Sequence, residues 1–140
     1  MTEQNFWQYI RSNLFDVRMY RVENKVMQGM PDLHYIHEGI TGWIELKFLN
    51  DWPKKRMTTG LMLTQAMWLE EYALSGGNSW IMIRIAREFT GLIGGRDAMK
   101  IYDRPSRAAF MGMLCWHATG NLKEEDWINL KNTICHLLVK

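Results

Sequence analysis

The chain has 140 residues, of which 47% are hydrophobic and 23% are charged, and its formal net charge at pH 7 is +2. A chain of this length and balance is expected to bury one hydrophobic core, as a single domain over residues 1–140. The weak net charge excludes a protein that binds nucleic acid through positive charge spread over its whole surface. Any such binding requires a local basic cluster.

Neither the cysteines nor the terminal hydropathy indicates secretion or a membrane. Cys115 and Cys135 are the only cysteines, too few for a disulfide framework, and we expect two buried free thiols. The N-terminus shows no basic stretch followed by an apolar segment. No uncharged apolar run approaches the roughly 18 residues of a membrane span. We therefore expect a cytoplasmic protein without a membrane partner, in the host cytoplasm if the gene belongs to a phage.

Apolar spacing in the first half of the chain predicts one helix followed by three strands. Thr2 is placed to cap a helix in which Phe6, Ile10 and Leu14 repeat at helical spacing. Runs rich in strand-forming residues predict strands over 16–22, 32–37 and 43–49. Residues 38–42 predict the turn that joins the last two strands as a hairpin.

The second half continues the alternation and then changes character. A helix is predicted over 61–75, an apolar central strand over 79–86 and a shorter strand over 89–93. Helices are predicted over 105–117 and 123–138. This order predicts an α/β sandwich around a mixed sheet over 1–93, followed by a helical C-terminal extension over 96–140.

Charged side chains interrupt two of the predicted strands. Asp32 begins one strand, and Glu45 and Lys47 lie in the next. Because side chains alternate along a strand, Glu45 and Lys47 share one face, and the hairpin is expected to bring Asp32 beside them. Buried charges require a partner. Two carboxylates and a backbone carbonyl form a hard oxygen site suited to Mg²⁺, so the sequence predicts a metal ion here.

The motifs at these positions resemble those of the PD-(D/E)xK nuclease superfamily. The resemblance lies in Gly-x-Pro-Asp-Leu at 29–33, Glu-Leu-Lys at 45–47 and Gln65 in the next helix. It covers residues 1–93 and is nearest to the virus-type replication-repair nucleases and the archaeal Holliday-junction resolvases. It implies a restriction-endonuclease-like α/β/α sandwich. It also implies Mg²⁺, which Mn²⁺ can replace, bound by Asp32, Glu45 and the Leu46 carbonyl, with Lys47 as the catalytic lysine.

The resemblance also implies a third carboxylate and a supporting glutamine. Glu3, in the first predicted helix, is the implied third metal ligand, and Gln65 is the implied supporting residue. Each residue also suits a purely structural role, Glu3 at the dipole of its helix and Gln65 on a helix surface. Glu23 is a second candidate for the third carboxylate and ranks below Glu3.

A basic cluster follows the strand that carries Lys47. Lys54, Lys55 and Arg56 are placed to contact nucleic-acid phosphates, and a solvated loop accounts for these three charges equally well. His34 and His37 lie three residues apart on a predicted strand. They therefore face opposite sides and cannot chelate zinc together.

Two functions are consistent with this sequence. The first is an Mg²⁺-dependent endonuclease that hydrolyses DNA, selective for branched forms such as Holliday junctions or flaps, in phage replication or recombination. It would act as a homodimer whose interface is formed by apolar residues of the tail, namely Phe110, Met113, Leu114, Trp116, Trp127 and Leu130. The alternative is a non-catalytic inhibitor or adaptor on the nuclease fold that binds nucleic acid or protein. The presence of all three signature residues favours the first.

Overall fold

A six-stranded mixed sheet forms the centre of the protein, whose computed structural model describes residues 2–23 and 25–136. The strands lie side by side in the order in which they occur in the chain. Neighbouring strands are antiparallel, except that β3 and β4 are parallel. The strands are β1 (Arg18–Arg21), β2 (Leu33–His37), β3 (Ile40–Leu49), β4 (Ser79–Ile85), β5 (Phe89–Gly94) and β6 (Leu114–Thr119).

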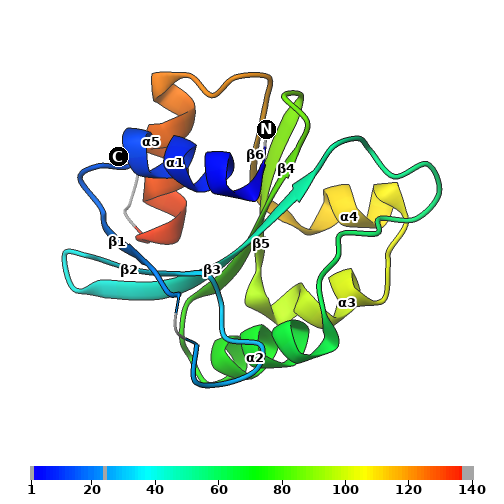
Figure 1. Cartoon of the computed structure of the whole chain (residues 1–140), viewed down its shortest axis with the longest axis horizontal. Coiled ribbons are helices and arrows are strands. Elements are labelled where there is room, and N and C mark those ends of the chain that lie inside the picture. Colours follow the sequence, from blue (N-terminus) through cyan, green and yellow to red (C-terminus); the bar gives the residue numbers. More distant parts are fainter. Residues whose placement is uncertain (1, 24, 137–140) are drawn as a thin grey trace.

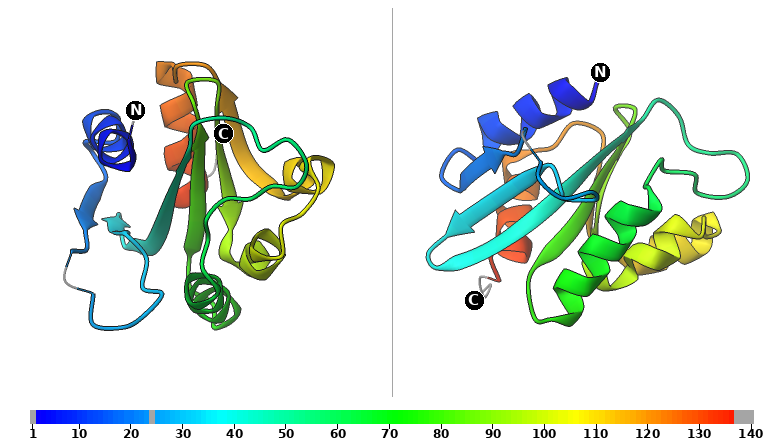
Figure 2. Two further views of the ribbon diagram at one scale, coloured as in Figure 1. Left: turned by 45° about the vertical axis from the view of Figure 1, so that its right-hand side comes forward. Right: turned by 60° about the horizontal axis from the view of Figure 1, so that its bottom comes forward.

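Helices cover both faces of this sheet (Figures 1 and 2). Helices α1 (Glu3–Asn13) and α5 (Glu124–Ile134) pack on one face, over a core of their own. The other face carries α2 (Leu63–Leu74), the 3-10 turn η1 (Gly95–Asp97), α3 (Ala98–Tyr102) and α4 (Arg107–Met113). The α/β/α layering therefore agrees with the predicted sandwich. Within the described residues, no helix has the length and apolar character needed to cross a bilayer.

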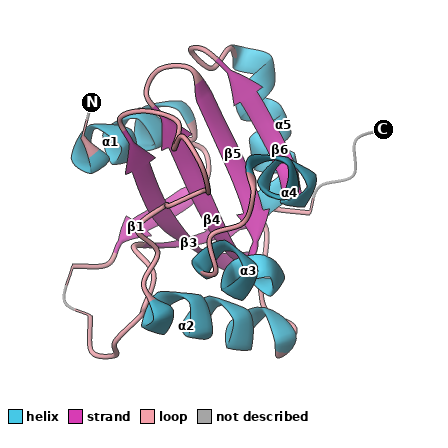
Figure 3. Cartoon of the chain, turned by 90° about the vertical axis from the view of Figure 1, so that its right-hand side faces the viewer, coloured by secondary structure: helices cyan, strands magenta, loops and turns pink. Residues whose placement is uncertain are grey.

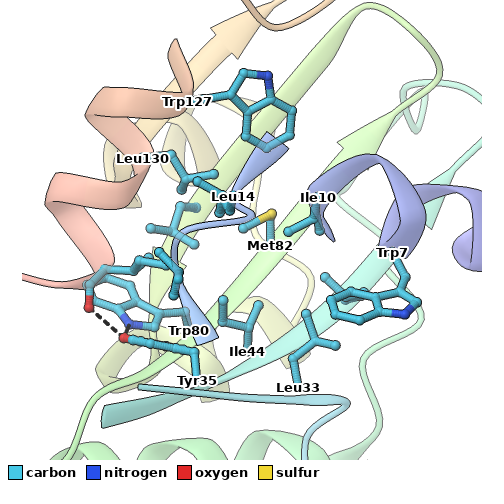
Figure 4. Packing of buried hydrophobic residues seen from close by; sticks show 14 of the residues in the cluster. Trp7, Ile10, Leu14, Leu33, Tyr35, Ile44, Trp80, Met82, Trp127 and Leu130 are labelled. Carbon is cyan, nitrogen blue, oxygen red and sulfur yellow. Dashed lines mark hydrogen bonds between the residues drawn. The ribbon is translucent and has the colours of Figure 1, made fainter. Parts of the chain in front are cut away.

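The core beneath α1 and α5 contains many of the large aromatic side chains (Figure 4). At its lower edge the Tyr35 hydroxyl donates a hydrogen bond to the Ile134 carbonyl oxygen at 2.6 Å. The same hydroxyl accepts a hydrogen bond from Trp80 Nε1 at 3.0 Å. Burial raises the pKa of Tyr35 far above its usual range, so the phenol stays protonated. One side chain therefore links β2, β4 and the end of α5.

The hairpin between β2 and β3 is tighter than the sequence predicted. The turn consists of Glu38 and Gly39, and β3 begins at Ile40 rather than at residue 43. Both turn residues have positive φ angles, 49° and 83°. Positive φ at both positions is the conformation of a two-residue type I′ turn, which matches the twist of the flanking strands. The pairing continues from there to Leu33 opposite Ile44.

The C-terminal segment is not helical throughout, so this part of the prediction was wrong. The helix predicted over 105–117 ends at Met113, and residues 114–119 form β6, which pairs with β5 at the edge of the sheet (Figure 3). The expectation of two buried thiols also fails, because Cys115 on this edge strand is exposed while Cys135 is buried. Side chains alternate between the two faces along β6, and the face that carries Cys115 is the exposed one.

The apolar residues of the tail belong to the internal cores and do not form a separate interface. Phe110, Trp127 and Leu130 are buried within the chain itself. The other three residues predicted for a dimer interface are partly buried and pack against the same cores, namely Met113, Leu114 and Trp116. Of the predicted interface residues, only Met113, Leu114 and Trp116 have exposed parts that a homodimer could use.

Candidate active site

Asp32 lies immediately before β2, at the point where that strand leaves β3. The ladder between the two strands extends to Leu33 opposite Ile44. Beyond it, Asp32 Oδ2 accepts a hydrogen bond from the backbone N–H of Leu46 at 2.9 Å. In a strand, the N–H and C=O of one residue point to the same neighbour. The Asp32 carboxylate and the Leu46 carbonyl therefore face the same notch between the strands.

Glu45 and Lys47 project from β3 on the face that α2 covers. Glu45 is only 1% exposed, and its Oε2 lies 3.2 Å from Lys47 Nζ. The other oxygen, Oε1, is buried and has no hydrogen-bond partner among the described residues. Desolvation, followed by repulsion from Asp32, raises the pKa of Glu45 to about 7, against the opposing attraction of Lys47.

These features fit a divalent cation. A buried carboxylate with one unpartnered oxygen and a raised pKa lies in a place where Lys47 does not fully compensate for burial and for the charge of Asp32. Oxygens of Asp32, Glu45 and the Leu46 backbone provide the hard donor set that Mg²⁺ and Mn²⁺ prefer. These three residues would hold the ion, and their assignment as ligands remains a prediction.

The segment before Asp32 is pressed against the start of α2. Gly29 has a φ of +81°, and a Cβ at this position would lie 2.1 Å from the Thr64 carbonyl oxygen. Pro31, two residues later, is buried. Two independent features therefore require glycine at position 29, namely the positive φ angle and the close approach of α2. This contact sets the position from which the chain enters β2.

Gly29→Ala is expected to destabilise the protein by more than about 2 kcal/mol, because the added methyl group overlaps the Thr64 carbonyl and also strains the backbone. Gly39→Ala is the matched control, since Gly39 has a φ of +83° but open space around its Cβ position. The control should cost roughly 1 kcal/mol, from backbone conformation alone. Urea unfolding of both variants measures the difference. Equal losses would show that the contact with α2 contributes nothing.

Gln65 caps its own helix. Its Oε1 accepts a hydrogen bond from the backbone N–H of Met62 at 2.9 Å, which satisfies a free donor at the start of α2. Its backbone nitrogen lies close to Gly29, at 3.0 Å from the position of a Cβ there. Gln65 thus lies beside the segment that leads to Asp32. Its support of the site remains a prediction.

The third carboxylate stays unassigned. Within residues 2–23 and 25–136, no three or more His, Cys, Asp or Glu side chains come together as a metal site. Glu3 is exposed in the first turn of α1, and Glu23 is exposed in the β1–β2 connection. Next to Glu3, Gln4 accepts a hydrogen bond from Arg21, the residue paired with Leu33. The first turn of α1 is therefore tied to β1 at the residue that pairs with Leu33, and Glu3 as a ligand remains a prediction.

Lys25 was not predicted from the sequence. Its Nζ lies 2.8 Å from Asp32 Oδ1. Because Oδ2 of Asp32 is already bound by the Leu46 N–H, both oxygens of this carboxylate have partners. No periodic or motif signal marks Lys25, because it lies in the irregular connection between β1 and β2.

Aromatic packing joins α2 to the strands of the site. The ring of His34 lies 4.7 Å from that of Trp43, and Trp43 lies 5.4 Å from Trp68 of α2, measured between ring centroids. His34 is therefore part of a packed aromatic row. Such edge and tilted contacts stabilise the helix on the sheet.

The basic cluster after β3 is exposed, as expected of either a phosphate-binding or a solvated loop. Lys54, Lys55 and Arg56 lie in a loop that is fixed against the α3–α4 connection. The Met57 N–H donates to the Pro105 carbonyl at 2.9 Å. Nearby, the Arg107 guanidinium lies 3.9 Å from the Trp52 ring centroid and adds a fourth positive charge. Contact with nucleic acid remains a prediction for this cluster.

Comparison with known proteins identifies the fold. No family model and no curated protein sequence matches the chain. Among solved structures, it is similar to a Holliday junction resolvase from the archaeal hyperthermophile Archaeoglobus fulgidus, with a TM-score of 0.51 and 15% sequence identity over 66% of this chain and 77% of the resolvase. The predicted α/β fold is confirmed: the chain has the restriction-endonuclease-like fold of this resolvase.

Proposed function

We propose that the chain is a divalent-metal-dependent nuclease that hydrolyses DNA phosphodiester bonds at a site formed by Asp32, Glu45 and Lys47. The observation that carries this proposal is Glu45 Oε1, a buried carboxylate oxygen without a partner among the described residues, beside a second carboxylate. Such an arrangement costs stability in the metal-free protein and leaves a carboxylate oxygen free for a cation to bind. The shared fold with the Archaeoglobus resolvase supports the same proposal.

Each side chain has a defined part in the proposed reaction. A bound Mg²⁺ would supply Lewis acidity toward the phosphate and lower the pKa of water. Asp32 is fixed by the Leu46 N–H before substrate arrives, so little reorganisation is needed on binding. Lys47, held by Glu45, would orient the attacking water or stabilise negative charge on the phosphate.

We further propose branched DNA as the substrate, such as Holliday junctions or flaps, and a role in phage replication or recombination. The Archaeoglobus protein is a Holliday junction resolvase, which supports the first of these. A homodimer would place two sites on two strands. Lys54, Lys55 and Arg56, with Arg107, would contact the phosphates that flank the cut.

One observation favours a non-catalytic module instead. Both acidic side chains are already paired with lysines, Asp32 with Lys25 and Glu45 with Lys47. Two such pairs partly neutralise the site without a metal ion. A binding protein that uses the nuclease fold as an inhibitor or adaptor is therefore the second candidate.

A cleavage panel tests these proposals. Fluorescent four-way junctions, flaps and linear duplexes are incubated with the protein in Mg²⁺, in Mn²⁺ or in EDTA. We expect cleavage of the branched substrates with either metal and none in EDTA. Binding of junctions without cleavage in any metal would favour the adaptor. Equal cleavage of all substrates would retain the nuclease and overturn its selectivity.

A further inference from the structure

Each of the two carboxylates of the site is paired with a lysine, and the two lysines lie in different parts of the fold. Lys47 belongs to β3 and contacts Glu45, with 15% of its side chain exposed. Lys25 belongs to the irregular connection between β1 and β2 and contacts Asp32, with 31% of its side chain exposed. Lys47 is therefore fixed by the sheet, whereas Lys25 reaches the site from outside it.

Lys25 contacts Oδ1 of Asp32, which is the oxygen of this carboxylate that the backbone does not bind. Oδ2 of Asp32 is held by the Leu46 N–H at 2.9 Å. Oδ1 faces Lys25 Nζ at 2.8 Å. An ammonium group and a divalent ion cannot share this oxygen closely, because two cations about 4 Å apart repel strongly in a partly buried site. Binding of a metal ion at Asp32 Oδ1 is therefore expected to displace Lys25.

We propose that Lys25 is a built-in cation that neutralises Asp32 until the metal ion binds, and that its released ammonium group then binds a phosphate of the DNA backbone. This inference rests on the proposed function. It makes Lys25 a substrate-binding residue whose release couples metal binding to DNA binding. An ammonium group displaced from a carboxylate on an exposed segment is well suited to a phosphate contact.

The first test measures metal binding without DNA. Mn²⁺ is titrated by calorimetry into the wild type, Lys25→Met and Lys100→Met. Lys25→Met keeps the apolar stem and removes the competing charge, so its affinity for Mn²⁺ should rise about fivefold. Lys100, which belongs to α3 and pairs with Asp97, is the charge-matched control and should leave the affinity unchanged.

The second test measures DNA binding at several salt concentrations, in a Lys47→Met background in which cleavage is expected to be too slow to disturb the binding measurement. With Mn²⁺ present, adding Lys25→Met should weaken binding and reduce the slope of log K against log salt by roughly one. In EDTA, where Lys25 stays on Asp32, the same change should leave the slope as it was.

The outcomes separate this inference from the proposed function. If wild type and Lys25→Met bind Mn²⁺ with equal affinity, or if the loss of DNA binding is the same with and without metal, the role of Lys25 is overturned and the metal site stands. If neither protein binds Mn²⁺, the metal site is overturned, and the role of Lys25 with it.

Discussion

Lys47→Met is expected to slow DNA cleavage by roughly 10²–10³-fold while leaving metal binding intact. The reason is positional, since Lys47 Nζ lies 3.2 Å from Glu45 on the face of the sheet where the reacting phosphate would bind. Removing the ammonium group takes away a charge that acts on the phosphate or on the attacking water. Single-turnover cleavage of a four-way junction, with protein in excess, measures the chemical step directly.

Asp32→Asn serves as the comparison, because it is expected to remove a metal ligand, whereas Lys47→Met is expected to leave metal binding intact. The asparagine oxygen can still accept the Leu46 N–H, so the local backbone is preserved. The lost negative charge removes a metal ligand, and both cleavage and Mn²⁺ binding should fall. Cleavage by Lys47→Met at the wild-type rate would show that the lysine only neutralises Glu45. Loss of metal binding in Lys47→Met would show that it positions the ligands.

The metal-free protein is expected to lose stability as the pH rises from about 4.5 to about 7. The folded-state pKa of Glu45 is about 7, above its ordinary value of 4.5. The folded protein therefore holds this proton over a range in which the unfolded chain has released it, and the free energy of unfolding decreases with pH across that window. For a shift of this size the loss is about 3 kcal/mol, complete above pH 7.

Glu45→Gln isolates that contribution. The glutamine is neutral at every pH, so the variant should lack this part of the decline and should be more stable than the wild type at pH 8 in EDTA. Glu71→Gln, at an exposed position of α2, should follow the wild type. Urea unfolding between pH 5 and pH 8 measures all three. Parallel curves for wild type and Glu45→Gln would contradict the assigned pKa. Saturating Mn²⁺ should restore stability to the wild type at pH 8 and leave the variant unchanged.

Local signals were enough to predict the part of the fold that carries the site. The capping threonine, the apolar spacing of α1 and the alternation of β2 and β3 depend on neighbouring residues, and the structure contains those elements. The face shared by Glu45 and Lys47 follows from strand alternation alone. The turn at Glu38 and Gly39 was placed too broadly, because two residues with positive φ suffice to reverse the chain.

Features that depend on distant partners were missed. Residues 114–119 form a strand that pairs with the free edge of β5, and the alternation of Leu114, Trp116 and Ala118 with more polar residues was a strand signal that the helical interpretation overlooked. Lys25 reaches Asp32 across an irregular connection, so its role appears only in three dimensions. The choice between Glu3 and Glu23 depends on how the first turn of α1 and the β1–β2 connection lie around the notch, which sequence spacing does not specify.

The order of the strands has a consequence for how the protein folds. A two-residue turn joins β2 and β3 into one hairpin. Glu45 and Lys47 lie in this hairpin, and Asp32 directly precedes its first strand. Closing so short a loop costs little entropy, and hairpins form within microseconds. We expect the carboxylates to meet early, in water, where their repulsion is screened. The electrostatic cost of the site arises only later, when α2 and the β1–β2 connection exclude solvent from that face.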